Sequence, residues 1–239
     1  MGLLMPRKKT ILQSHFPYHI YNRSLDQRFF KVPMATLWKI FSEEAFYAST
    51  LWNLQFHSLV LMGNHYHAIV STPDANISAG MCDFQSEVAR RISQYLGRDS
   101  YRFQSRYRWS IIANPGHFGS VYKYVYQNPL RAGICARVED YPFSTLHGLI
   151  GSSVLGVPIK SCHLGVELFE SSPMDMVTWL NDFYDPSESD RIRKGLKKSN
   201  FEIMNYASSF AERARLLEKS SYLSAADGLT NNPIAMSSR

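Results

Sequence analysis

Apolar positions along the first 130 residues follow two different periods. Runs of β-branched and aromatic residues predict strands, and apolar residues three or four apart predict helices. The expected strands are 15–23, 52–61, 65–71 and 102–113, and the expected helices are 32–47, 77–96 and 118–128. Gly63-Asn64 separates the second and third strands by two turn-forming residues, which predicts an antiparallel hairpin.

The element order β-α-β-β-α-β-α predicts an α+β fold of the ferredoxin-like, split βαβ type, with helices on an antiparallel sheet. We expect this domain to span residues 1–147. Residues 148–239 are expected to form a mostly helical C-terminal extension. Within it, 148–156 is Gly/Ser-rich and 165–173 is loop-like, helices are expected at 174–183, 189–198 and 201–219, and the polar tail 225–239 is expected to be disordered.

The charge of the chain is concentrated in one part. The 239 residues carry a formal net charge of +6, and residues 1–150 hold 16 Lys and Arg against 9 Asp and Glu. Residues 151–239 hold 10 against 11, so the whole excess belongs to the predicted domain. A basic domain is typical of proteins with a polyanionic partner such as nucleic acid.

The three cysteines are far apart and form no CxxC pair, which argues against a disulfide framework or a zinc ribbon. No apolar run reaches the roughly 18 residues that a membrane span needs, and the first residues lack a signal-peptide core. We therefore expect no membrane association and a cytoplasmic, nucleoid-associated location.

Candidate chemistry lies on the third strand and the third helix. Strand side chains alternate, so His65 and His67 project from one face and form half of a divalent-metal site. Tyr124 and Asn128 are four apart on the helix and share a face. A metal ion could bind His65, His67 and the Asn128 oxygen, leaving positions for phosphate oxygens; Mg²⁺ or Mn²⁺ fits this donor set.

Each of these features also has a structural interpretation. The two histidines could simply be packed, Asn128 before Pro129 could end the helix, and Tyr124 could belong to an aromatic packing face. The combination favours the catalytic interpretation. The other six histidines show no partner pattern and are expected to be structural or on the surface: His15, His19, His57, His117, His147 and His163.

Three ordered motifs carry a family resemblance. The runs MGNHYHAIV at 62–70, YVYQNPLRAG at 124–133 and DYPFS at 140–144 resemble the single-tyrosine HUH transposases, and within them the REP-associated tyrosine transposases. The resemblance covers about residues 10–147. It implies that His65 and His67 are metal ligands, Tyr124 the nucleophile and Asn128 the third ligand. Gly63 departs from the family, which usually has proline there.

The resemblance implies cleavage and rejoining of single-stranded DNA at hairpin-forming repeats through a 5′-phosphotyrosine, with Mg²⁺ or Mn²⁺ and no nucleotide cofactor. Basic residues are expected to contact DNA, beside aromatic residues that could stack on bases. These basic residues are Arg102, Arg106, Arg108, Lys123 and Arg131, and the aromatic ones are Tyr101, Phe103, Tyr107 and Trp109. A solvated basic edge strand is the alternative for 101–109.

Other functions remain open at this level. A replication initiator or relaxase of the HUH type would use the same chemistry, although the NPLRAG run at 128–133 argues against it. A catalytically inactive regulator that binds hairpin DNA is the alternative from another class, and a ferredoxin-like nucleic-acid-binding module with incidental histidines is a further one. Either a monomer or a homodimer is expected. The repeat recognised, the group that deprotonates Tyr124 and the role of 148–239 are left undetermined.

Overall fold

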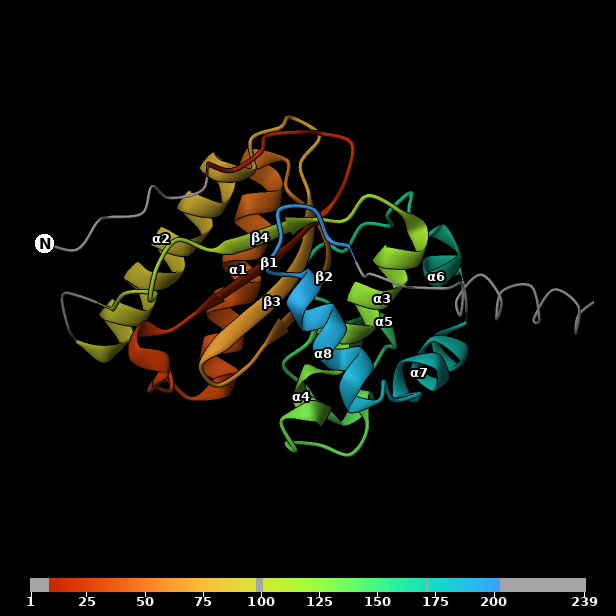
Figure 1. Ribbon diagram of the computed structural model, residues 1–239. Helices are drawn as coiled ribbons and strands as arrows, with labels where there is room; N and C mark the ends of the chain where they lie inside the picture. Colours follow the sequence, from red (N-terminus) through yellow and green to blue (C-terminus); the bar gives the residue numbers. More distant parts are fainter. Residues whose placement is uncertain (1–8, 98–100, 171, 203–239) are drawn as a thin grey trace, which may run out of the picture. The chain divides into compact units, whose positions relative to one another are not determined.

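A four-stranded antiparallel sheet is the centre of the fold in the computed structural model, which describes residues 9–97, 101–170 and 172–202. The strands follow the order β2-β3-β1-β4, so β1 and β3 are central (Figure 1). Their bounds are β1 Tyr18–Arg23, β2 Gln55–Leu61, β3 His65–Ser71 and β4 Arg108–Ile111. The predicted α+β class and antiparallel sheet are confirmed.

Helices cover both faces of this sheet. The helices α1 (Met34–Trp52) and α2 (Ile77–Leu96) pack on one, which we call the helix-pair face. The helix α3 (Pro115–Tyr126) packs on the other, the tyrosine face (Figure 1). Shorter elements complete the described chain: η1 Leu25–Gln27, α4 Asn128–Arg131, η2 Val138–Asp140, α5 Thr145–Leu149, α6 Val166–Glu170, α7 Pro173–Asn181 and α8 Pro186–Gly195.

The alternation of β3 divides its side chains between the two faces. Tyr66, Ala68 and Val70 are fully buried in the core beneath α1 and α2. Ile69 is buried in the second core, beneath α3, and His65 and His67 share its direction. The Gly63-Asn64 turn joins β2 to β3, because the Met62 amide donates to the His65 carbonyl at 2.8 Å. The predicted hairpin is therefore confirmed.

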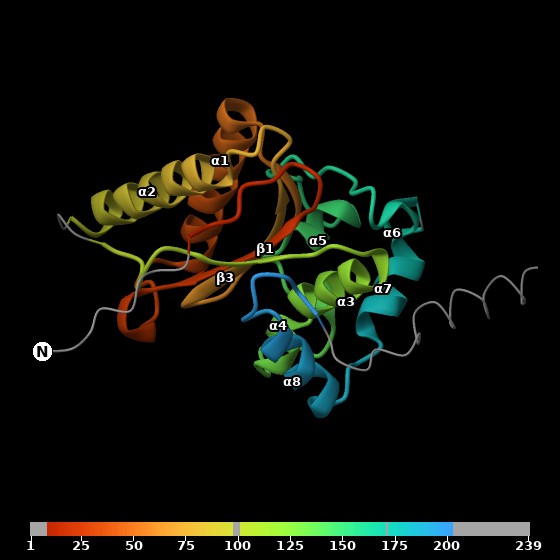
Figure 2. The same ribbon diagram turned by 45° about the horizontal axis from the view of Figure 1, so that its top comes forward.

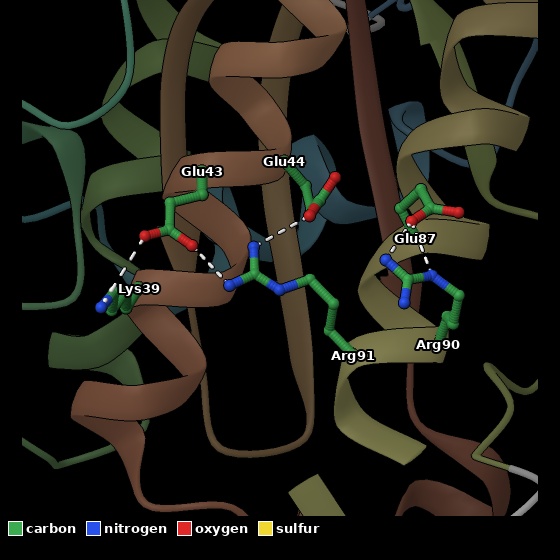
Figure 3. Close-up of polar contacts among 6 residues, drawn as sticks. All are labelled: Lys39, Glu43, Glu44, Glu87, Arg90 and Arg91. Atoms are coloured by element: carbon green, nitrogen blue, oxygen red, sulfur yellow. Dashed lines mark hydrogen bonds and ion pairs between the residues drawn. The ribbon is translucent and has the colours of Figure 1, made fainter. Parts of the chain in front are cut away.

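Ion pairs join α1 to α2 on their outer side. Arg91 of α2 contacts both Glu43 and Glu44 of α1, the latter at 2.9 Å (Figure 3). Lys39 and Glu43 lie 3.9 Å apart along α1, one turn away from each other. The Lys39–Glu43 pair is exposed and adds little to stability, whereas Arg91 supplies a counter-charge to the buried Glu44 carboxylate.

Several predicted boundaries are wrong. The strand expected at 102–113 pairs regularly only over Arg108–Ile111, because the preceding residues bond irregularly to the end of β1; the Asn22 side chain donates to the Ser105 carbonyl, for example. The helix α1 continues to Trp52 and ends where Asn53 adopts a left-handed φ of 51°. The short helix α6 lies in the expected loop 165–173. Of the expected helix 201–219, Phe201 and Glu202 are not helical, and the rest lies outside the described residues, as does the tail 225–239.

The first part of the C-terminal extension docks on α3. Lys123 forms a 3.2 Å ion pair with Asp182, and the Gln127 side chain donates to the Leu180 and Asp182 carbonyls. Contacts group the described residues in one unit, and these bonds cross the boundary expected at 147. In the described part of the chain, no helix is long and apolar enough to cross a membrane.

Candidate active site

A cavity of about 800 Å³ opens on the tyrosine face, between β1, β3, β4, α3 and α8. Its size is in the range of ordinary ligand sites. Five of the side chains that line it are cations: Arg106, Arg108, Arg131, Arg193 and Lys197. None of its described lining residues is an aspartate or a glutamate. The cavity therefore suits an anionic ligand.

The two predicted ligands lie together in this cavity. The ring centres of His65 and His67 are 5.3 Å apart, with the ring planes at 84°. With ligand nitrogens about 2.0–2.1 Å from a metal, the ring centres of two adjacent imidazoles would be roughly 5 Å apart. The His65 Nδ1 bonds to the Asn64 side-chain oxygen at 2.6 Å, and this leaves the lone pair on Nε2 of His65.

His19 is a third histidine that lines the cavity, although the sequence predicts only a structural or surface position for it. It comes from β1, and its Nε2 lies 2.9 Å from the Nδ1 of His67. When His67 donates this hydrogen bond, the lone pair of its other ring nitrogen is available to a ligand. The strand period of β1, with His19 and Tyr21 on one face and Tyr18 and Ile20 on the other, was the signal that could have indicated it.

All three imidazoles are held in their neutral form. Burial lowers the pKa of His19 to about 3. It also lowers the pKa of His65 to about 4, with further contributions from the positive charges of Arg131 and Arg23. The pKa of His67 is lowered by burial first, and then by the neighbouring histidines and Arg131. The neutral ring is the form that binds a metal or accepts a hydrogen bond.

Tyr124 reaches the site from α3. The centre of its ring lies 5.9 Å from the ring centre of His67 and 6.5 Å from that of His19, and both pairs are nearly edge to face. The guanidinium carbon of Arg131 lies 3.8 Å from the centre of the Tyr124 ring. The structure thus brings together the predicted nucleophile, the predicted ligands and a cation.

Asn128 is beside Tyr124, as the helical spacing predicts, but its oxygen is already bonded. The side-chain amide donates to the Tyr124 and Val125 carbonyls, and the oxygen accepts a 2.6 Å hydrogen bond from Arg131. A metal ion at this oxygen would have to displace the guanidinium. Two imidazoles therefore fit a divalent ion directly, whereas Asn128 does so only after Arg131 moves. Across the described ranges, no group of three or more His, Cys, Asp and Glu side chains is placed to hold a metal ion.

The five predicted DNA contacts divide into two sets. Arg106, Arg108 and Arg131 line the cavity, and Arg102 does not. Lys123 lies away from it: its side chain is 3% exposed, pairs with Asp182 and lies over the rings of Trp179 and Tyr184. This places Lys123 at the contact between α3 and the C-terminal extension.

The aromatic residues of 101–109 belong mainly to the core. Tyr107 and Trp109 border the cavity but are buried in the core beneath α1 and α2, and Tyr101 and Phe103 pack against that core. The Trp109 ring contacts that of Tyr18 edge to face. The expectation that they stack on bases therefore gains no support from their positions, because Tyr107 and Trp109 are buried and Tyr101 and Phe103 pack against the same core.

Comparisons with known proteins find similarity to solved structures. No protein-family model and no curated protein matches the chain. Among solved structures, the chain is similar to a REP-associated tyrosine transposase bound to a REP hairpin, with a TM-score of 0.53 and 17% sequence identity. The similarity covers 67% of this chain and 97% of that one. At this identity the likeness concerns the fold.

Proposed function

We propose that this protein is a metal-dependent transposase or endonuclease that cleaves and rejoins single-stranded DNA at hairpin-forming repeats. One observation carries the proposal: Tyr124 lies beside His67 in a cavity lined by five cations and by no acidic residue among those described. The likeness in fold to a transposase bound to a REP hairpin adds support.

The chemistry follows from the residues of the cavity. The Tyr124 oxygen attacks the phosphorus of a phosphodiester, a tyrosine–phosphorus bond forms, and the bond from phosphorus to the 3′ oxygen breaks. The phenol loses its proton and the departing 3′ oxygen gains one. Arg131 lies over the attacking ring and offsets negative charge near the phosphate. Attack by another 3′-hydroxyl reverses the step and joins two strands.

His65 and His67 are the residues that would hold a divalent ion, since their rings face the same cavity in the neutral form. When bound, Mg²⁺ or Mn²⁺ would supply Lewis-acid polarisation of the scissile phosphate. His19 would act behind His67, by holding its ring through the 2.9 Å hydrogen bond.

The test is covalent capture of DNA. A labelled DNA hairpin with a single-stranded flank is incubated with the protein and Mn²⁺ or Mg²⁺, and the denatured mixture is examined for a protein–DNA adduct. Tyr124→Phe should lower adduct formation at least about 10³-fold, because it removes the nucleophile. Tyr126→Phe is the matched control; its hydroxyl bonds to Thr145, away from the cavity, so the adduct should persist.

A second candidate is a hairpin-binding regulator that does not cut DNA. The bond between Arg131 and the Asn128 oxygen favours it, since this arrangement leaves no third ligand in place among the residues that the structure describes. This regulator would bind the DNA hairpin with and without metal, and several repeat-derived substrates would give no adduct. That result would overturn the enzymatic proposal.

A further inference from the structure

The helix α8 forms one wall of the cavity, although it belongs to the C-terminal extension. We propose that Arg193, in the last turn of α8, and Lys197, in the turn after the helix, bind the phosphate backbone of the substrate strand opposite the arginines of the β4 side. The inference rests on the proposed function and deepens it, because it assigns part of the DNA site to the extension.

Several bonds fix α8 in this position. Ser189 of α8 accepts a 2.9 Å hydrogen bond from Arg131, the residue that also contacts Tyr124 and Asn128. After α8, Ser199 and Phe201 bond to Ile111, so the chain adds a short parallel bridge to the outer edge of β4. Both views show α8 beside α3 and α4 (Figures 1 and 2), and contacts join α3 and α8. The wall is therefore part of the folded unit.

Two cations at the C-terminal end of α8 line the cavity together. Arg193 lies in the last turn of α8 and Lys197 in the turn that follows, where the Lys197 amide donates to the Lys194 carbonyl at 3.2 Å, and both side chains line the cavity. Arg106 and Arg108 line it from the β4 side, and Arg131 lies near Tyr124. A strand between these two walls would have cations along both sides of its backbone, which is the arrangement that binds single-stranded nucleic acid.

Arg193 and Lys197 can each bind a phosphate. Arg193 has a 3.1 Å pair with Asp190, but both side chains are more than half exposed, so the pair is weak. A phosphate offers the guanidinium two charge-assisted hydrogen bonds and can replace Asp190. Lys197 is exposed, and no ion pair is found for it in the described part of the chain.

The same helix supplies a matched control. Arg191 and Lys194 are also exposed and carry the same charge, yet neither lines the cavity. The double variant Arg193→Ala/Lys197→Ala is therefore compared with Arg191→Ala/Lys194→Ala, which changes the net charge by the same amount. Affinity for a fluorescent DNA hairpin with a single-stranded flank is measured by anisotropy between 50 and 200 mM KCl.

The cavity double variant should bind about 10- to 100-fold more weakly at 50 mM KCl. Two lost phosphate contacts should also reduce the slope of log affinity against log salt by about 1.4, since single strands give about 0.7 per contact. The control should stay within about threefold of the parent. Arg193→Lys/Lys197→Arg should recover most of the affinity, which shows that the charges matter at these positions.

Equal losses in both double variants would overturn the inference, because a general charge effect would explain them. Tighter binding or faster adduct formation in the cavity double variant would also overturn it, since α8 would then act as a lid. A parent protein that binds no hairpin DNA would instead overturn the proposed function. Circular dichroism of each variant confirms that these exposed substitutions leave the fold intact.

Discussion

The two faces of the sheet differ in what they bury. The helix-pair face buries an almost entirely apolar core, in which Phe41, Phe84 and Tyr66 contact one another. The tyrosine face buries apolar residues too, but it also holds His19 and His67 in close contact. Polar groups are costly to bury, so their concentration on one face indicates that this face serves the chemistry.

A single strand supplies both environments. Successive side chains of β3 point in opposite directions, so His65 and His67 enter the cavity while Tyr66 enters the core beneath α1 and α2. The apolar contacts on the helix-pair face hold β3 in place, and this fixes the positions of His65 and His67 on the tyrosine face. Stability and chemistry can therefore be tested separately.

The largest expected effect is a loss of stability in mild acid, and it should come mainly from buried histidines. The folded-state pKa values of His19, His57 and His65 are about 3, 4 and 4, below the ordinary 6.5. Below pH 6.5 the unfolded chain takes up protons that the folded chain excludes, so stability is full above pH 6.5 and falls with the pH. We expect about 1–2 kcal/mol per histidine by pH 5.

Urea unfolding at pH 7, 6 and 5 measures this loss. His57 is bonded to Lys160 and Ser71, outside the cavity, so His57→Asn should reduce the pH dependence without changing DNA binding at pH 7. A free energy of unfolding that does not change between pH 7 and 5 would contradict the burial of neutral histidines.

The next effect concerns the helix-pair face alone. Phe84→Ala removes a ring that is 1% exposed and contacts Phe41 and Phe56, and it should cost about 3–5 kcal/mol of unfolding free energy. The comparable change at the exposed Phe46, also on a helix of this face, should cost less than about 0.5 kcal/mol. Denaturant titration measures both. Similar costs at the two positions would show that Phe84 does not lie in a packed core.

The smallest effect separates the two roles on the tyrosine face. Lys123→Met should cost about 1–3 kcal/mol of stability, because it removes a buried ammonium that pairs with Asp182 and contacts two rings. The affinity of the Lys123→Met variant for hairpin DNA should stay the same. Arg108→Met changes an exposed residue of the cavity, so it should weaken the binding of hairpin DNA and leave the stability nearly unchanged. Thermal unfolding measures the stability of each variant, and fluorescence anisotropy measures its affinity for hairpin DNA. Weaker DNA binding by Lys123→Met than by Arg108→Met would contradict this prediction and indicate that Lys123 contacts DNA.

Most of the fold could be predicted because it depends on local patterns. The bounds of α2 and β3 match the predicted 77–96 and 65–71, since strong periodicity and clear turn residues mark both elements. The strand expected at 102–113 was overestimated. Its aromatic residues are β-prone, but only four residues pair regularly with β1. Pairing is a property of two segments, and the composition of one cannot determine it.

Local periodicity was sufficient to place His65 beside His67, and Tyr124 beside Asn128, because each pair lies within one element of known geometry. The tertiary structure decided everything that joins separate elements. His19 of β1 contacts His67 of β3, and the Asn128 oxygen accepts a hydrogen bond from Arg131. Lys123 pairs with Asp182, and the end of α8 lines the cavity. These contacts depend on how whole elements pack together. The periodicity within one element does not determine how it packs against another element that is distant in the sequence.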